Sequence, residues 1–148
     1  MNKAKGALSG ITVVELCGER GQLMGKLMGD MGARVIKIEP PSGVNERCIG
    51  PFKDDDPHPD RSLFFWAHNT SKESLAVELE SEVGKSVIGQ LALKADVLLE
   101  DFPPRYLSSL GLGYDNLSIM NPQLIMTSLT GFGQDGPYKD YKSSDIVS

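Results

Sequence analysis

The chain has 148 residues, a formal net charge of −5 and a sequence pI near 5.0, so it can form one domain or a piece of one. The acidic balance argues against nucleic acid as the main partner, because domains that bind it usually carry a basic face. The longest unbroken apolar run is residues 63–67, whereas a membrane span needs about 20 residues, and no apolar segment near the N-terminus predicts a secretory signal. Two cysteines without metal or redox spacing favour a reduced, cytoplasmic protein.

The first 40 residues predict a strand, a helix and a second strand. Residues 11–16 are rich in β-branched side chains and lie between glycines, which is typical of a strand. Residues 22–31 repeat apolar side chains at helical spacing, which predicts a helix with its apolar stripe in the core. Gly25 and Gly29 each weaken that helix by about 1 kcal/mol relative to alanine, so we expect a close approach to the sheet there. Residues 33–39 predict the second strand, ended by two prolines.

The middle of the chain begins with a long loop and returns to regular structure. Residues 42–60 are rich in proline, glycine and aspartate, and a loop of this length is typically functional or mobile. Residues 63–67 form a buried segment that fits either a helix or a strand. Residues 74–79 alternate weakly and predict a third strand, after which Ser81 is suited to begin a helix as its N-cap.

The last third adds two strands and two short helices. Residues 95–100 and 124–129 predict strands, and between them two short helices are expected after Pro103-Pro104 and over residues 114–120. Strands therefore alternate with helices along the chain. This order predicts an α/β fold: a Rossmann-like open, mostly parallel sheet with helices on both faces.

Ligands of such sheets bind beyond the carboxyl ends of the strands, so the loops after the strands are the candidate site. The loop after the first strand could contact phosphate at a helix N-terminus, but it lacks the GxGxxG pattern, and Glu19 would repel an anion. Glu39 stands where a dinucleotide-binding acid would lie. These two features leave a nicotinamide-binding oxidoreductase domain open as an alternative.

The loop after the last strand is rich in glycine. Gly131, Gly133 and Gln134 could line a concave site with backbone N–H groups, although a simple strand-to-helix turn has the same composition. Cys17 precedes a helix, but no histidine lies near it in sequence, so a buried structural thiol is favoured over a nucleophile. The chain has no GxSxG or HExxH motif and no paired acidic motif, and we expect no metal site.

Several segments, taken in order, resemble one enzyme family over nearly the whole chain. The segments are residues 8–16, 28–41, 69–72, 95–102, 121–125 and 128–138. In this order they are similar to the class III CoA-transferases, a family that includes formyl-CoA transferase, carnitine CoA-transferase and α-methylacyl-CoA racemase.

This resemblance implies a Rossmann-like domain that holds coenzyme A, with acyl-CoA and a carboxylic acid as substrates, in a homodimer whose two chains interlock. It also implies covalent catalysis, in which an aspartate takes the acyl group and then CoA. The family's nucleophile lies a few tens of residues beyond the position that matches Asp145. We therefore expect residues 1–148 to be the N-terminal part of the CoA-binding domain, inactive alone.

The resemblance also implies roles for individual residues. Lys142 matches a lysine that contacts CoA, Asp101 and Phe102 match a pair beside the coenzyme, and the glycine-rich loop would support developing negative charge. Glu80 stands where a phosphate-binding lysine can occur, so the phosphate contacts must differ. The implied cofactor-binding set is Gly18, Val77, Asp101, Phe102, Arg105, Ser109 and Lys142.

Two further alternatives remain within this resemblance. The racemase branch has a catalytic histidine at the position of Ser144, and its replacement by serine argues against an acyl-CoA racemase or isomerase. The other alternative is a non-catalytic subunit that binds CoA or a nucleotide and pairs with an active partner. The sequence does not distinguish among acyl groups.

Overall fold

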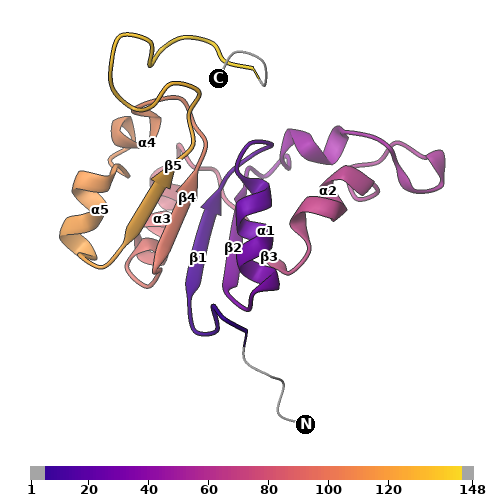
Figure 1. The fold of residues 1–148 in the computed structure, drawn as a ribbon, viewed down its shortest axis with the longest axis horizontal. Helices are drawn as coiled ribbons and strands as arrows, with labels where there is room; N and C mark the ends of the chain where they lie inside the picture. Colours follow the sequence, from indigo (N-terminus) through magenta and orange to yellow (C-terminus); the bar gives the residue numbers. More distant parts are fainter. Residues whose placement is uncertain (1–5, 145–148) are drawn as a thin grey trace.

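A computed structural model describes residues 6–144 as five strands with helices packed around them (Figure 1). Every pairing in the described sheet is parallel, and the spatial order is β3-β2-β1-β4-β5. The strands are β1 (Thr12–Leu16), β2 (Arg34–Glu39), β3 (Lys72–Ala76), β4 (Val97–Glu100) and β5 (Ile125–Ser128). The predicted parallel α/β sheet is confirmed.

Helices cover both faces of the sheet, as expected from the alternating pattern. The helices are α1 (Gln22–Asp30), α2 (Leu63–Asn69), α3 (Glu82–Ala92), α4 (Tyr106–Ser109) and α5 (Tyr114–Met120), with 3-10 turns η1 (Asn45–Cys48) and η2 (Lys53–Asp55). One apolar core lies under α3, α4 and α5, and a smaller one lies under α1. Among the described residues, none of these helices is long and apolar enough to cross a bilayer.

Local signals account for most element boundaries. Ser62 and Ser81 cap α2 and α3, since their hydroxyl oxygens accept the backbone N–H groups of Phe65 and Gly84. The segment at 63–67, which sequence left open, is therefore a helix. The third strand begins earlier than predicted and ends at Ala76, so residues 77–80 form a loop beyond it.

The helix α1 approaches the sheet closely through its glycines, as predicted. A Cβ at Gly25 would collide with Glu15 Oε2, and one at Gly29 would lie 2.9 Å from the Ser71 carbonyl oxygen. This contact turns the predicted stripe partly away from the core. Met24 and Met28 pack on the smaller core, whereas Leu23 and the other members of the stripe are exposed.

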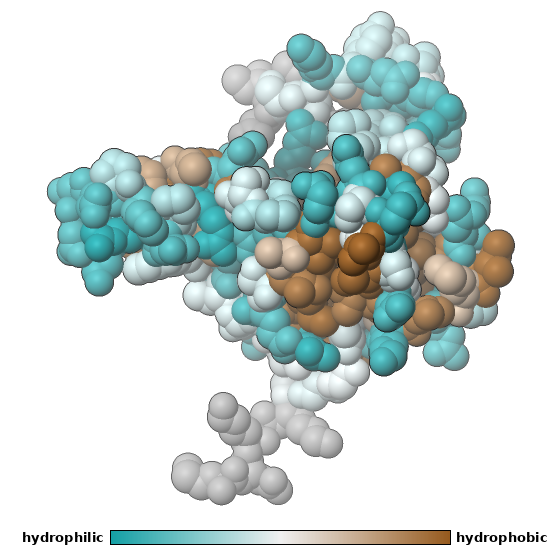
Figure 2. All heavy atoms as spheres, turned by 180° about the vertical axis from the view of Figure 1, so that it is seen from behind, coloured by the Kyte–Doolittle hydropathy of each residue, from teal (hydrophilic) through white to brown (hydrophobic). Residues whose placement is uncertain are grey.

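The opposite side of the molecule carries uncovered apolar surface. Figure 2 shows apolar side chains gathered near the centre of this side, with hydrophilic residues around them. Val83, at the start of α3, is 75% exposed, because Gly84 and Ile88 rather than Val83 face inward from this helix.

Candidate functional site

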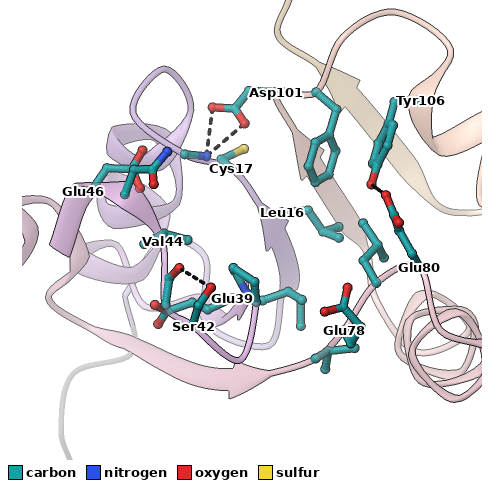
Figure 3. A pocket seen from close by; sticks show the side chains of 18 residues that line it. Leu16, Cys17, Glu39, Ser42, Val44, Glu46, Glu78, Glu80, Asp101 and Tyr106 are labelled. Carbon is teal, nitrogen blue, oxygen red and sulfur yellow. Dashed lines mark hydrogen bonds between the residues drawn. The ribbon is translucent and has the colours of Figure 1, made fainter. Parts of the chain in front are cut away.

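The strand order creates a switch point at the carboxyl end of β1. The chain runs from β1 outward through β2 to β3, and then returns to the other side of β1 with β4, so the loops after β1 and β4 diverge. A cavity of about 390 Å³ opens at this point, and we name it the switch-point pocket (Figure 3). It is lined by Leu16, Cys17, Gly18, Ile38, Glu39, Pro40, Ser42, Gly43, Val44, Asn45, Glu46, Val77, Glu78, Leu79, Glu80, Asp101, Phe102 and Tyr106.

Asp101 joins the two diverging loops. Its carboxylate accepts the backbone N–H of Gly18 at 2.9 Å to each oxygen, and the N–H of Gly21 at 3.2 Å. A Cβ at Gly18 would lie only 2.8 Å from Glu46 Oε1, so glycine allows a second carboxylate to approach. A protein carboxylate therefore occupies the N–H groups ahead of α1 where sequence suggested a phosphate.

Glu39 closes the β2 side of the pocket and is held in an ion pair. Arg47 donates to both of its carboxylate oxygens, at 2.6 and 2.9 Å, and Ser74 Oγ donates at 2.7 Å. Burial raises the pKa of Glu39, but the hydrogen bonds from Arg47 and Ser74 outweigh burial and leave it below its ordinary value. Because Arg47 engages both oxygens, Glu39 gives the nicotinamide alternative no support.

The β4 side of the pocket is an aromatic wall. The rings of Phe102 and Tyr106 lie 4.8 Å apart and tilted, and both pack against the larger core together with Val77 and Leu79. The Tyr106 hydroxyl donates to Glu80 Oε1 at 2.9 Å on the same side of the pocket (Figure 3). Partial burial and this acidic neighbour raise the pKa of Tyr106. The wall offers a flat, apolar surface for a ring-shaped group.

Four of the residues carried over from the resemblance meet in this pocket. Gly18, Val77, Asp101 and Phe102 all line it, although they come from the loops after three different strands. Sequence reasoning did not select Tyr106 for the pocket. Phe102 precedes α4, which begins at Tyr106, so no helical spacing in the sequence predicts that the two rings pack together.

Lys142 lies in a neighbouring cavity that contains three cationic side chains. This basic pocket, of about 530 Å³, is lined by Arg20, Asp101, Phe102, Pro103, Pro104, Thr130, Lys139, Asp140, Tyr141, Lys142 and Ser143. Arg20 donates to the Ser143 carbonyl oxygen at 3.3 Å, which joins the first loop to the last. Asp101 and Phe102 belong to both pockets, so the two cavities share a wall.

Arg105 and Gln134 lie in a third cavity, of about 350 Å³, together with the buried Glu100. Gln134 donates to Glu100 Oε1 at 3.3 Å and accepts the Arg105 N–H at 3.1 Å, so it fastens the last loop to the end of β4. Burial raises the pKa of Glu100. Ser109 is exposed on α4 and, within residues 6–144, lines none of these three cavities.

The glycine-rich loop folds back on the chain ahead of residue 144. A Cβ at Gly131 would collide with Ser143, and Gly133 has a φ of 85°, in the left-handed region. Both glycines therefore serve the path of the loop. Asp145, the other position that the resemblance brought into view, lies outside the described residues.

Cys17 is a buried thiol, as predicted. It is 2% exposed, and burial followed by the nearby charge of Asp101 raises its pKa well above the ordinary range, which keeps it protonated. Over the described part of the chain, no group of histidine, cysteine and acidic side chains is placed to hold a metal ion.

A second group of charged side chains, which we name the Glu15 cluster, lies beneath α1. It contains Glu15, Gln22, Lys37, Asn69 and Lys72. Lys37 Nζ donates to Glu15 Oε1 at 3.0 Å and to the Cys17 carbonyl oxygen at 2.6 Å. Lys72 Nζ donates to the same Glu15 oxygen at 2.9 Å and to the Gln22 carbonyl oxygen at 2.7 Å. The two lysines of the cluster thus hold both ends of the loop between β1 and α1 through the carbonyl oxygens of Cys17 and Gln22.

Sequence reasoning missed the Glu15 cluster. Glu15 and Lys37 lie within strands and are 0% and 1% exposed, and burial lowers the pKa of Lys72. A carboxylate and a lysine inside neighbouring buried strands were the available signal, because parallel strands place them side by side at Glu15↔Lys37.

Comparison with known proteins yields one consistent result. The family model for CoA-transferase family III matches residues 8–148. A subunit of succinyl-CoA:(R)-benzylsuccinate CoA-transferase from Thauera aromatica is 40% identical over 91% of this chain and 33% of its own length. Acetyl-CoA:oxalate CoA-transferase from Acetobacter aceti is 38% identical over 98% of this chain and 36% of its own length.

Solved structures agree with the sequence comparison. A crystal structure of a CAIB/BAIF family protein from Brucella suis superposes with a TM-score of 0.88 at 35% identity, covering 97% of this chain and 38% of that one. The chain therefore spans about a third of the length of the curated relatives that it matches.

Proposed function

The chain belongs to CoA-transferase family III, and on that premise we propose that it forms the coenzyme-binding part of an enzyme that moves CoA from an acyl-CoA to a free carboxylic acid. One observation carries this proposal. Gly18, Val77, Asp101 and Phe102, which the family resemblance assigns to the coenzyme, line a single cavity at the switch point of the sheet. Cavities at that position are where open parallel sheets bind nucleotides.

We place the adenosine end of CoA in the switch-point pocket and its diphosphate toward the basic pocket. The apolar and aromatic walls suit a purine, which packs flat against rings and aliphatic side chains. Arg20, Lys139 and Lys142 supply the positive charge that a diphosphate requires. Asp101 and Phe102 line both cavities, so the two proposed sites adjoin each other. Arg105 and Ser109 line neither of these two cavities, and their roles stay predictions.

The chemistry proposed for the whole enzyme is acyl transfer through an aspartate beyond residue 148. The aspartate oxygen attacks the thioester carbon, the C–S bond breaks, and CoA leaves as a thiolate, which gives a mixed anhydride. The thiolate then attacks the aspartyl carbonyl and displaces the donor acid, which gives an aspartyl-CoA thioester. The acceptor carboxylate repeats these two steps in reverse and leaves as the new acyl-CoA. In this scheme residues 6–144 hold CoA in place.

A second candidate is a non-catalytic subunit that binds CoA beside an active partner. The observation that favours it is the name of the Thauera relative, which describes a subunit of a CoA-transferase. An interlocked homodimer and a cytoplasmic location belong to the first candidate as proposals. Both candidates require the same coenzyme pocket and differ in whether this chain continues to its own nucleophile.

Calorimetric titration of the chain with CoA tests the pocket, and product analysis tests the reaction. We expect CoA to bind, and the 148 residues alone to produce no new thioester when mixed with an acyl-CoA and a second acid. Val77→Asp should weaken CoA binding at least about tenfold, because the purine would pack against a carboxylate that must lose its water instead of against an apolar side chain. Val83→Asp is the matched control on the exposed start of α3. No binding by the folded chain would refute the proposal.

A further inference from the structure

The lining of the switch-point pocket is strongly acidic. Five of its 18 residues are carboxylates, and among the residues that the structure describes none of the 18 is lysine, arginine or histidine. The carboxylates are Glu39, Glu46, Glu78, Glu80 and Asp101. Arg47, which pairs with the pocket-lining Glu39, has its guanidinium committed to that carboxylate in the ion pair described above. The pocket therefore has a negative potential that a bound group must tolerate.

Three of these carboxylates, Glu46, Glu78 and Glu80, have no cationic partner among the described residues. Glu80 accepts one hydrogen bond, from the Tyr106 hydroxyl, and within residues 6–144 no hydrogen bond or ion pair engages the Glu78 carboxylate. Both belong to the loop after β3 that forms one side of the pocket (Figure 3). By contrast, Asp101 is satisfied by three backbone N–H contacts.

The two polar groups at the adenosine end of CoA respond to this lining in opposite ways. The exocyclic amino group of adenine donates two N–H groups, which carboxylate oxygens accept well. The 3′-phosphate on the ribose carries nearly two negative charges at neutral pH and needs cationic or N–H partners when it leaves water. A pocket with free carboxylates and no cation in its lining can bind the first and repels the second.

We therefore propose that this chain binds CoA while disfavouring its 3′-phosphate, and that Glu80 is the residue that sets this preference. The proposal rests on the function proposed above and specifies which groups of the coenzyme the pocket favours. Glu80 is placed for this role because it lines the pocket and its carboxylate is held beside the aromatic wall by the Tyr106 hydroxyl. The diphosphate keeps its own partners in the basic pocket.

The direct test compares CoA with dephospho-CoA, which lacks only the 3′-phosphate, by calorimetry at low ionic strength. We expect dephospho-CoA to bind more tightly than CoA. A CoA affinity equal to or higher than that of dephospho-CoA would overturn this inference and leave the proposed function standing. Binding of neither ligand to the folded chain would overturn both.

Salt provides a measurement that needs no variant. Repulsion of the 3′-phosphate is screened as ionic strength rises, so CoA should gain affinity relative to dephospho-CoA between about 20 and 300 mM salt, a range over which the Debye length shortens about fourfold. A site that attracts this phosphate would show the reverse trend, with CoA losing relative affinity. The trend in this ratio therefore supports or contradicts the inference by its sign.

A charge reversal at Glu80 tests the residue itself. Glu80→Lys should raise the affinity for CoA relative to dephospho-CoA by about tenfold, because a repulsive charge becomes an attractive one, and Glu80→Gln should give a smaller rise. Glu82→Lys makes the same charge change two residues away, on a side chain that is 92% exposed and outside the pocket lining. An unchanged ratio in a folded Glu80→Lys variant would contradict the role of Glu80.

Discussion

The Glu15 cluster and the switch-point pocket use the same residue types for opposite purposes. In the cluster, one carboxylate lies between two lysines, and Glu15 and Lys37 are fully buried beneath α1. In the pocket, Glu78 and Glu80 face a cavity that has no cation in its described lining. Glu15 and Lys37 lie within strands, whereas Glu78 and Glu80 follow the end of β3. Position along the strand therefore separates charges that hold the fold from charges that meet a ligand.

The largest expected effect comes from breaking the Glu15 cluster. Glu15→Leu leaves Lys37 and Lys72 buried without their shared carboxylate, which should lower the free energy of unfolding by about 3–5 kcal/mol. Urea denaturation monitored by circular dichroism measures this change. Glu80→Leu removes a carboxylate from the pocket and should cost within about 0.5 kcal/mol, because that residue is exposed. Equal urea midpoints for the two variants would abolish the distinction drawn between the regions.

Asp101 is an intermediate case, because it belongs to the pocket and also ties two loops together. Asp101→Ala leaves the N–H groups of Gly18 and Gly21 without their acceptor and should lower stability by about 1–3 kcal/mol. CoA affinity should fall as well, since the two loops would no longer be held at the switch point. Asp135→Ala, at a side chain that is 92% exposed, serves as the control for thermal unfolding. A stable variant with unchanged CoA binding would show that this tie is unimportant.

A substitution at Lys142 is expected to change the affinity for CoA without changing the stability of the fold. Lys142→Ala should weaken CoA binding by about three- to tenfold and leave the melting temperature unchanged, because the side chain is exposed at the basic pocket. Lys94→Ala removes another exposed lysine, outside all three cavities, and should leave affinity unchanged. Equal CoA affinities for the two variants would count against the diphosphate position.

The smallest effect concerns pH, and it contrasts the carboxylates that end β2 and β4. Burial raises the pKa of Glu100, so its contribution to stability is present below its unfolded pKa of about 4.3 and is lost as pH rises through the folded value. The pKa of Glu39 is lowered overall by Arg47 and Ser74 despite burial, so its contribution is present above that unfolded pKa and is lost as pH falls through the folded value.

Unfolding free energies measured between pH 3 and 8, a range chosen to bracket the unfolded carboxyl pKa of about 4.3, test these signs. As pH rises, the stability of Glu100→Gln should increase relative to wild type, whereas the stability of Glu39→Gln should decrease relative to wild type. Parallel pH profiles for the two variants would show that the ion pair with Arg47 does not separate them.

Most of the fold followed from the sequence, because periodicity and turn residues report local structure directly. The end of β3 was misplaced, since residues 77–80 alternate like a strand but leave the sheet to line the pocket. The stripe of α1 was misjudged for a different reason. Apolar spacing marks Leu23 and Leu27 as well as Met24 and Met28, but the glycines decide which side of α1 touches the sheet.

The site was predictable only where a resemblance supplied it. Gly18 and Phe102 were selected in this way, and the structure brings them together, whereas the ion pair of Glu39 with Arg47 depends on a loop whose path no local pattern specifies. Sequence position alone also does not reveal that Glu15 and Lys37 neutralise each other. That contact requires the order of the strands, which emerges only when the sheet is assembled.

The most direct test of the central claim, that CoA binds at the switch point, is to map the backbone amide resonances of the isotopically labelled chain during titration with CoA. The account predicts that the amides of Gly18, Val77 and Phe102 shift together with a single affinity, while those of the Glu15 cluster beneath α1 shift little. Shifts confined to other surfaces, or no shifts in a folded chain at saturating CoA, would contradict it.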